Sequence, residues 1–251
     1  MRRRVWLLTG ASGGLGSALA RLASAAGDEV VAIGRKSVDI TDPAQVRRAV
    51  AEAVATFGRI DVVVNNAGYA AAGAFEELSD AALREQFEVN FFAAADVLRA
   101  TLPYLRAARS GHIVQISSLA GQIGAPGMSA YTARKHALEG LSVSLAEELA
   151  PFGVRVSIVE PGAISTGFRR SWVERERPGT IADYDDLAAR LDRIGRDAHR
   201  PTEPEDVAAA ILALTDLPEP PLRLPVGSDA AAGIRAARTR QLADLETEWT
   251  A

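Results

Sequence analysis

The chain has 251 residues, of which 48% are hydrophobic and 24% are charged. This composition fits one globular domain with a sizeable core. Its 28 basic and 32 acidic residues give a net charge of −4, which leaves no basic excess for nucleic acid. With no cysteine, a disulfide framework, a thiolate metal site and a cysteine nucleophile are excluded. No apolar run approaches the ~18 residues of a membrane span, so we expect a cytoplasmic protein without membrane or nucleic-acid partners.

Short apolar runs alternate with helical patterns along the chain. We expect strands at 5–8, 29–33, 61–64, 112–116, 154–159 and 222–224, and helices at 14–26, 44–57, 79–107, 129–150, 204–215 and about 230–248. Apolar strands that alternate with helices predict a parallel sheet covered on both faces, a doubly wound α/β fold of the Rossmann type. Ligands of such folds bind at the carboxyl ends of the strands.

Three glycines follow the first strand. Gly10, Gly14 and Gly16 have the spacing G-x-x-x-G-x-G. Glycines let a backbone turn tightly and approach a phosphate, and the following helix would present free N–H groups and a positive dipole end. The sequence therefore predicts a pyrophosphate site, although the same pattern also fits a strand-to-helix turn without a ligand.

The end of the second strand bears on the choice of dinucleotide. Gly34 occupies the place where NAD-binding folds usually carry an acid, and Arg35 and Lys36 follow it. An arginine can bind a 2′-phosphate, so we expect NADPH to be preferred over NADH. A merely solvated pair of surface charges is the alternative.

Two segments depart from a regular alternation. Too few residues separate Gly34 from Asp39 and Ile40 for a parallel crossover. We therefore expect the helix and strand after the second strand to be missing or vestigial, with Asp39 and Ile40 crossing the adenine. We also expect residues 163–203 to form a substrate lid on the single domain 1–251, with a surface loop as the alternative.

Tyr131 and Lys135 are four residues apart, on one face of a predicted helix. A free tyrosine has a pKa of about 10, and a nearby cation stabilises the phenolate form, as proton transfer near neutrality requires. Lys135 is one of only two lysines in the chain. The pair alone also fits an ordinary helix surface.

Further motifs accompany this pair: Asn65-Asn66-Ala67-Gly68 with Asn90, Ser118 thirteen residues before Tyr131, and 161–166. Together with the glycine turn they resemble the short-chain dehydrogenase/reductase family over about residues 4–166. The resemblance implies a catalytic tetrad of Asn90, Ser118, Tyr131 and Lys135. Tyr131 would give a proton to a carbonyl oxygen held by Ser118, Lys135 would support the tyrosine and bind the nicotinamide ribose, and Asn90 would hold a relay water.

The resemblance also implies which residues contact the dinucleotide. Besides Tyr131 and Lys135, these are Gly10, Ser12, Gly14, Leu15, Gly16, Arg35, Lys36, Asp39, Ile40, Asn66, Ala67, Gly68, Pro161, Gly162, Ile164 and Thr166. Expected walls of the substrate pocket are Tyr69, Leu119, Gln122, Met128, Phe168 and Trp172. His112 and His136 match no family role and are interpreted as ordinary surface or helix residues. No metal is expected.

These observations favour an NADPH-dependent ketoreductase for a small lipophilic carbonyl or alcohol. The sequence resembles the branch that contains hydroxysteroid dehydrogenases and carbonyl reductases. Epimerisation, dehydration or cyclisation with the same cofactor, or a non-catalytic NADP-binding sensor, are the alternatives. The ending lacks the family's common Asp-Gly-Gly, so a homodimer through helices near 91–107 and 131–150 is expected rather than a tetramer.

Overall fold

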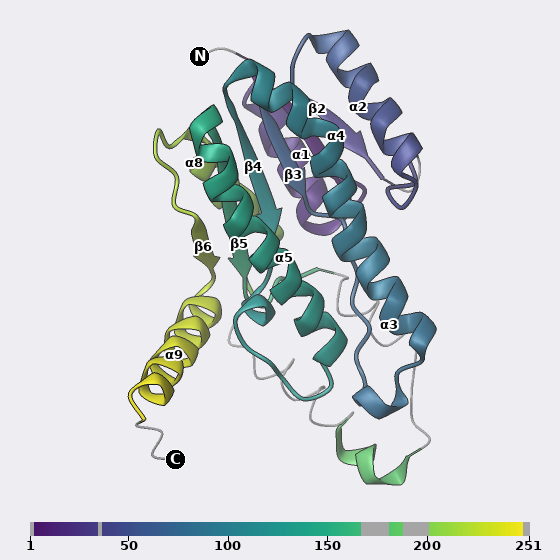
Figure 1. Cartoon of the computed structure of the whole chain (residues 1–251), viewed down its shortest axis with the longest axis vertical. Helices are drawn as coiled ribbons and strands as arrows, with labels where there is room; N and C mark the ends of the chain where they lie inside the picture. The colour runs from purple at the N-terminus through teal and green to yellow at the C-terminus, as the bar shows by residue number, and fades with distance from the viewer. Residues whose placement is uncertain (1–2, 35–36, 167–180, 188–200, 248–251) are drawn as a thin grey trace.

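The computed structural model describes residues 3–34, 37–166, 181–187 and 201–247. Six parallel strands form one sheet in the order β2-β1-β3-β4-β5-β6 (Figure 1). The strands are β1 (Val5–Thr9), β2 (Glu29–Ile33), β3 (Val62–Asn65), β4 (Gly111–Ile116), β5 (Val154–Pro161) and β6 (Arg223–Val226). The predicted parallel, doubly wound α/β fold is confirmed.

The direction in which strands are added reverses at β1. Trp6 pairs with Val30 of β2 on one side and with Val62 of β3 on the other. Connections on the two sides of this point run to opposite faces of the sheet, which opens a crevice at the carboxyl ends of β1 and β3. The sheet therefore places a binding site where the glycine turn leaves β1.

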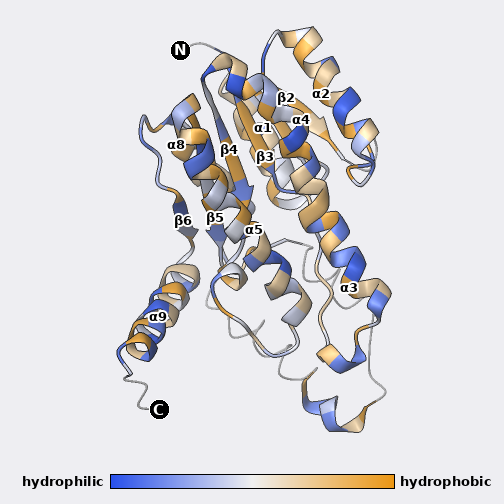
Figure 2. Cartoon of the chain, in the orientation of Figure 1, coloured by the Kyte–Doolittle hydropathy of each residue, from blue (hydrophilic) through white to orange (hydrophobic). Residues whose placement is uncertain are grey.

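Helices cover both faces of the sheet (Figure 1). One core cluster packs α2 (Pro43–Phe57), α4 (Ala93–Ala108) and α5 (Ser129–Leu149) against side chains such as Leu7 and Ile113. A second packs α1 (Gly14–Ala25) and α8 (Pro204–Asp216) against the other face, around Trp6 and Val64. Figure 2 shows the central strands predominantly hydrophobic, as burial between two helical layers requires.

The segment between β2 and α2 is short, as predicted. Among the described residues between 34 and 42 there is neither a helix nor a strand, and β2 is the edge strand of the sheet. Asp42 is the N-cap of α2, and its carboxylate accepts hydrogen bonds from the backbone N–H groups of Ala44 and Gln45. Arg35 and Lys36 lie outside the described residues.

The single helix expected at 79–107 is wrong in its middle. The chain forms α3 (Asp80–Phe87), a π turn η2 (Glu88–Phe92) and then α4. The side-chain amide of Asn90 donates to the Gln86 carbonyl at 2.7 Å and accepts from the Tyr69 N–H at 2.9 Å. Such side-chain bonds compete with regular helix bonding and widen the turn.

The C-terminal part adds β6 beside β5 and then α9 (Ser228–Leu245), which leaves the body of the domain (Figure 1). The short helices are η1 (Phe75–Glu77), η3 (Leu119–Gly121), η4 (Ala150–Phe152) and η5 (Ala182–Tyr184). Among the described residues, none of the helices is both long enough and apolar enough to span a membrane. Much of the proposed lid, including Phe168 and Trp172, lies outside the described residues.

The expectation for His112 needs a correction, whereas His136 is an exposed residue of α5 as expected. His112 is in β4 with 1% of its surface exposed, and its Nε2 is 3.0 Å from the hydroxyl of Ser157 on β5. Burial, with nearby positive charges, lowers its pKa to about 3. The sequence reasoning failed here because a polar side chain at the start of an apolar run does not reveal which face it occupies.

Candidate active site

The turn after β1 is held tightly against the end of β3. Gly10 has φ +70°, and a Cβ there would lie 2.8 Å from the Cα of Ala67. A Cβ on Gly16 would lie 2.2 Å from the Gly10 carbonyl oxygen. The Thr9 hydroxyl accepts hydrogen bonds from the N–H groups of Asn66 and Ala67, both at 2.9 Å. Glycine is required at positions 10 and 16 because the two chain segments touch there.

The first turn of α1 faces outward from this contact. Its N-cap residue, Gly13, provides no side-chain cap, and the turn contains no acidic residue. Ser12 is exposed, whereas Leu15 is buried in the core below. A helix N-terminus with uncapped N–H groups and a positive dipole end favours an anion. The turn therefore fits the pyrophosphate of a dinucleotide, as its glycine spacing predicts.

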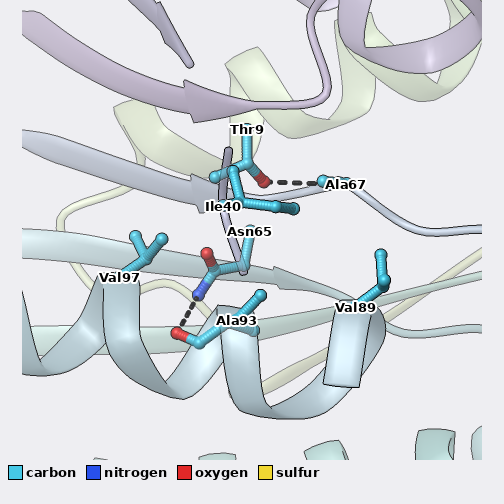
Figure 3. Close-up of a pocket in the computed structure, with 8 residues that line it drawn as sticks. Thr9, Ile40, Asn65, Ala67, Val89, Ala93 and Val97 are labelled. Atoms are coloured by element: carbon cyan, nitrogen blue, oxygen red, sulfur yellow. Dashed lines mark hydrogen bonds between the residues drawn. The ribbon is translucent and has the colours of Figure 1, made fainter. Parts of the chain in front are cut away.

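A pocket opens beside the turn, at the carboxyl ends of β1 and β3 (Figure 3). Its lining is Thr9, Ile40, Asn65, Ala67, Val89, Ala93, Ala94 and Val97. Ile40 comes from the short segment after β2, so the missing helix and strand allow this residue to reach the pocket. Asp39 beside it is exposed, and hydrogen bonds from Thr41 hold its pKa below the usual range. The lining is mostly apolar.

Gly34 follows β2 at the edge of the same region. A Cβ built on it would be 3.8 Å from the Gly10 nitrogen, and the Gly10 N–H donates to the Ile33 carbonyl at 3.0 Å. A side chain at position 34 would therefore be directed at the glycine turn. No carboxylate occupies this place.

Ser118 and residues 161–166 meet at the ends of β4 and β5. Ser118 caps η3, where its hydroxyl accepts from the Ala120 N–H at 3.1 Å, and it lies 3.5 Å from the Pro161 carbonyl oxygen. Ile164 packs on the core, and the Thr166 methyl would be 3.3 Å from a Cβ on Gly14. The structure thus brings the segment after β5 to both Ser118 and the glycine turn.

Sequence reasoning missed Asp229, in the first turn of α9. Its carboxylate accepts from the Ala163 N–H at 2.8 Å and fills the space where a Cβ on Gly162 would lie, only 2.1 Å from Oδ1. Asp229 thereby fixes the backbone directly after Pro161. No motif near residue 229 indicated this contact, because it depends on how α9 returns to β5.

Tyr131 and Lys135 lie one turn apart on α5, and both are buried. The Lys135 ammonium donates to the Ile116 carbonyl, the last of β4, at 2.5 Å. Tyr131 packs with Ala70, Met128 and Ala120, where Ala120 is two residues after Ser118. The pair and Ser118 are therefore held near the carboxyl end of β4. Burial, with the charge of Arg134 beside it, lowers the pKa of Lys135 well below its ordinary value.

Asn90 connects this edge with the segment after β3. A Cβ on Gly68 would be 2.5 Å from Asn90 Oδ1, so Gly68 allows the asparagine to approach the Asn66–Gly68 backbone. Both ends of the Asn90 amide bond to protein groups, the Tyr69 N–H and the Gln86 carbonyl. The Asn90 side chain therefore links the loop after β3 to the end of α3. A relay water at Asn90 would have to bond to amide atoms that already make these two hydrogen bonds.

Gln122, expected in the wall of the substrate pocket, has both atoms of its side-chain amide hydrogen-bonded to other side chains. Its Nε2 donates to the buried carboxylates of Glu139 at 3.0 Å and Glu160 at 2.7 Å. Arg223 bonds to both carboxylates, and Arg238 of α9 donates to Gln122 Oε1. Burial raises the pKa of Glu160. These residues join α5, β5, β6 and α9 behind the site, and spacing along the sequence could not have revealed the cluster.

The other expected pocket residues have mixed positions. Tyr69 and Met128 are buried, each 7% exposed, Met128 packs with Tyr131, and Leu119 lies in η3 next to Ser118. Two described lid residues contact η1, since the Ile181 N–H donates to Glu77 and the Tyr184 hydroxyl donates to Glu76. In the described part of the chain, no group of three or more His, Cys, Asp or Glu residues is arranged to hold a metal.

Comparisons with known proteins agree with this arrangement. The family model described as short chain dehydrogenase matches residues 36–177, more than half of the chain. Oxidoreductase BOA17 of Botryotinia fuckeliana is 39% identical over 90% of both chains. A 3-ketodihydrosphingosine reductase of Bacteroides thetaiotaomicron is 36% identical over 90% of this chain and 89% of its own.

Solved structures extend the likeness to three dimensions. A short-chain dehydrogenase from Streptomyces avermitilis is 37% identical, with a TM-score of 0.87 over 98% of this chain and 96% of its own. A family member from Burkholderia phymatum in complex with NAD is 26% identical, with a TM-score of 0.79 over 99% and 97%. The chain belongs to the short-chain dehydrogenase/reductase family and is an oxidoreductase.

Proposed function

We propose that the protein is an NADPH-dependent ketoreductase that reduces a lipophilic ketone or aldehyde to an alcohol. The observation that carries this proposal is the meeting of four groups at one edge of the sheet. Lys135 is anchored on the last carbonyl of β4, Tyr131 is one turn away, Ser118 follows β4, and Asn90 joins the loop after β3.

The glycine turn and its surroundings would hold the cofactor. The uncapped first turn of α1 suits the pyrophosphate, and the pocket around Ile40 suits the adenine. Gly34 removes the acid that would repel a 2′-phosphate, and Arg35 and Lys36 follow it in the sequence. The Pro161–Thr166 segment would face the nicotinamide, with Asp229 fixing its backbone. When bound, NADPH supplies the hydride.

Tyr131 would supply the proton in the same reaction. A substrate carbonyl oxygen would lie between its phenol and the Ser118 hydroxyl, which stabilises the negative charge that develops on that oxygen. The phenol gives up its proton to form the alcohol and becomes a phenolate. In the reverse direction the phenolate accepts the proton of the alcohol.

Lys135 and Asn90 would support this proton transfer. The positive charge of the lysine favours the phenolate, and its donor groups would also bind ribose hydroxyls. Because burial has lowered its pKa, Lys135 can release a proton more readily than a solvated lysine. Asn90 lies against Gly68. It would hold a water molecule through which the phenolate regains its proton.

The surroundings of Tyr131 favour an apolar substrate. Ala70, Met128 and Tyr131 form a small cluster with Ala72, Ala120 and Ala125 packed against it. Small and apolar side chains next to the reacting group favour hydrocarbon over a charged substituent. The relative from Bacteroides thetaiotaomicron is named for a ketone carried by a long-chain lipid, which supports the same substrate class.

We also propose that the protein is a cytoplasmic homodimer, with the outer surfaces of α4 and α5 at the interface. Three large apolar side chains are exposed in this region: Phe92 at 47%, Tyr104 at 38% and Val143 at 37%. Large apolar side chains exposed on these helices support the choice of this region as an interaction surface. Sedimentation of the wild type and of a Phe92→Glu variant would test the dimer.

The reaction itself is tested with purified protein and a panel of aromatic and long-chain ketones and aldehydes, 3-ketodihydrosphingosine included. We expect NADPH to be consumed in step with formation of the alcohol, and kcat/KM to be lower with NADH. Product formed without net loss of NADPH would indicate an epimerase, dehydratase or cyclase and contradict the proposal. An NADH activity equal to or above that with NADPH would contradict the cofactor preference.

A further inference from the structure

Arg134 stands between Tyr131 and Lys135 in the sequence and is 1% exposed. Its guanidinium donates from Nε to the Gln86 side-chain oxygen at 3.1 Å and from a terminal nitrogen to the Tyr69 carbonyl at 2.9 Å. Its central carbon is 4.2 Å from the centroid of the Tyr131 ring. A fully buried guanidinium therefore stacks on the side chain that we propose as proton donor.

These contacts complete a ring of hydrogen bonds around the site. The Tyr69 N–H donates to Asn90 Oδ1 at 2.9 Å, while the Tyr69 carbonyl accepts from Arg134. The Gln86 side chain accepts from Arg134, while the Gln86 carbonyl accepts from the Asn90 amide at 2.7 Å. The ring joins α5, the end of α3, the π turn and the loop after β3. Arg134 is its one charged member.

A buried arginine is costly unless its charge is compensated. The acceptors of the hydrogen bonds to Gln86 and Tyr69, an amide oxygen and a carbonyl, are both neutral. Burial lowers the pKa of Arg134 to about 10, and the interactions that oppose this are with Tyr131 and Tyr69. The arginine therefore stays protonated at neutral pH, and the groups able to balance its charge are phenols rather than carboxylates.

Lys135 is a less constant source of charge. Its Nζ is 5.9 Å from the centroid of the Tyr131 ring, against 4.2 Å for Arg134. Burial and the charge of Arg134 both lower the pKa of the lysine. The other described side chains packed against Tyr131 include Ala70, Ala120 and Met128, none of which titrates. The titratable groups that contact the Tyr131 ring are thus Arg134 and Lys135 of α5, and Tyr69 of the loop after β3 interacts with Arg134.

We propose that Arg134 is a positioning residue that holds the Tyr131 ring and supplies a positive charge, retained at neutral pH, that favours its phenolate form. The proposal rests on the proposed role of Tyr131 as proton donor. When the O–H bond of Tyr131 breaks and its proton passes to the carbonyl oxygen, the electron pair stays on the phenol oxygen. The neighbouring guanidinium, protonated at neutral pH, stabilises that negative charge.

The direct test needs no substrate. Ionisation of tyrosine shifts its near-ultraviolet absorption band to longer wavelength. A pH titration of the apoprotein, followed at the long-wavelength side of the band, therefore reports tyrosine ionisation. Subtracting the same titration of a Tyr131→Phe variant isolates Tyr131. The experiment compares Arg134 with Arg134→Gln and Arg134→Lys, each with and without Tyr131→Phe.

We expect Arg134→Gln to move the Tyr131 midpoint upward by about one pH unit, a tenfold loss of phenolate at a given pH. Arg134→Lys keeps the charge but not the planar fork, so its Tyr131 midpoint should stay close to that of the wild type. Equal midpoints in the wild type and in Arg134→Gln would overturn the proposal, since a purely structural arginine changes stability without changing the ionisation of Tyr131.

Gln86→Glu provides a second test if Arg134→Gln does not fold. Gln86 is fully buried, and in the described structure its Nε2 has no hydrogen-bond partner. A glutamate keeps the acceptor for Arg134 and adds a charge that neutralises the guanidinium. We expect the midpoint of Tyr131 to rise again while the thermal stability is maintained or increased. A raised stability with an unmoved midpoint would count against the proposal.

The outcomes also separate this inference from the proposed function. If the midpoints shift as expected but no carbonyl is reduced, the electrostatic role of Arg134 stands and the ketoreductase assignment fails. If ketones are reduced and Arg134→Gln lowers kcat by the same factor at every pH, the function stands and the charge effect is absent.

Discussion

Replacement of Gly16 by alanine tests whether the turn after β1 must be closed to bind a dinucleotide. The added Cβ would lie 2.2 Å from the Gly10 carbonyl oxygen and 2.6 Å from Asn66 Nδ2, where ordinary contacts begin at 3.4 Å. The backbone of the turn must therefore move by more than 1 Å. Overpacking of this kind costs about 1–3 kcal/mol, and the movement also displaces the first turn of α1.

Gly13→Ala is the matched control because Gly13 is in the same turn. A Cβ there meets no atom within 4 Å, and its φ of −171° is open to any residue. Titration of NADPH by fluorescence should give at least a tenfold weaker Kd for Gly16→Ala, about 1.4 kcal/mol, together with a lower Tm. Gly13→Ala should bind nearly as the wild type does. Tight binding by Gly16→Ala, or an equal loss in both variants, would refute the reasoning.

Two further predictions concern His112 and Asp229, which lie outside the turn. His112 has a folded pKa of about 3 against 6.5 for the free side chain, so protonation favours the unfolded chain and stability falls as pH drops below 6.5. The slope reaches about 1.4 kcal/mol per pH unit. Urea unfolding at neutral and acidic pH should show a smaller loss in His112→Gln and an unchanged loss in the exposed control His136→Gln; parallel losses in all three proteins would contradict the burial argument. Asp229→Ala removes the acceptor of the Ala163 N–H and should raise the Kd for NADPH several-fold, whereas Asp244→Ala, exposed on the same helix, should leave it unchanged. Equal Kd values would show that the cofactor does not depend on this contact.

Much of the fold could be predicted from the sequence because its strands are short and largely apolar and alternate with helical patterns. β2 occupies 29–33 as expected, and α2 and α5 begin and end within one residue of their predicted bounds. The missing strand after Gly34 followed from length alone, since a crossover needs more residues than the chain provides. These predictions depend on local pattern and chain geometry, which a single sequence carries.

The supporting contacts of the site could not be read in the same way. The interruption of the helix at Asn90 depends on a bond to Tyr69, which is distant in sequence. A charged residue within a helical pattern, such as Arg134, is normally read as a surface residue. Arg134 is instead buried against α3 and the loop after β3. Asp229 acts across 66 positions of the chain. In each case a polar side chain gains its role from a tertiary neighbour, so its own surroundings in the sequence gave no signal.

The central claim is that Tyr131 exchanges a proton with the substrate during reduction by NADPH. The most direct measurement compares kcat for NADPH-dependent ketone reduction by the wild type, Tyr131→Phe and Tyr104→Phe, with NADPH affinity measured in parallel. The Tyr104 variant undergoes the same chemical change at an exposed position of α4. We predict that Tyr131→Phe binds NADPH but loses at least ~10²-fold in kcat, while Tyr104→Phe keeps full activity. A Tyr131→Phe enzyme that reduces the ketone at the wild-type rate would contradict the account.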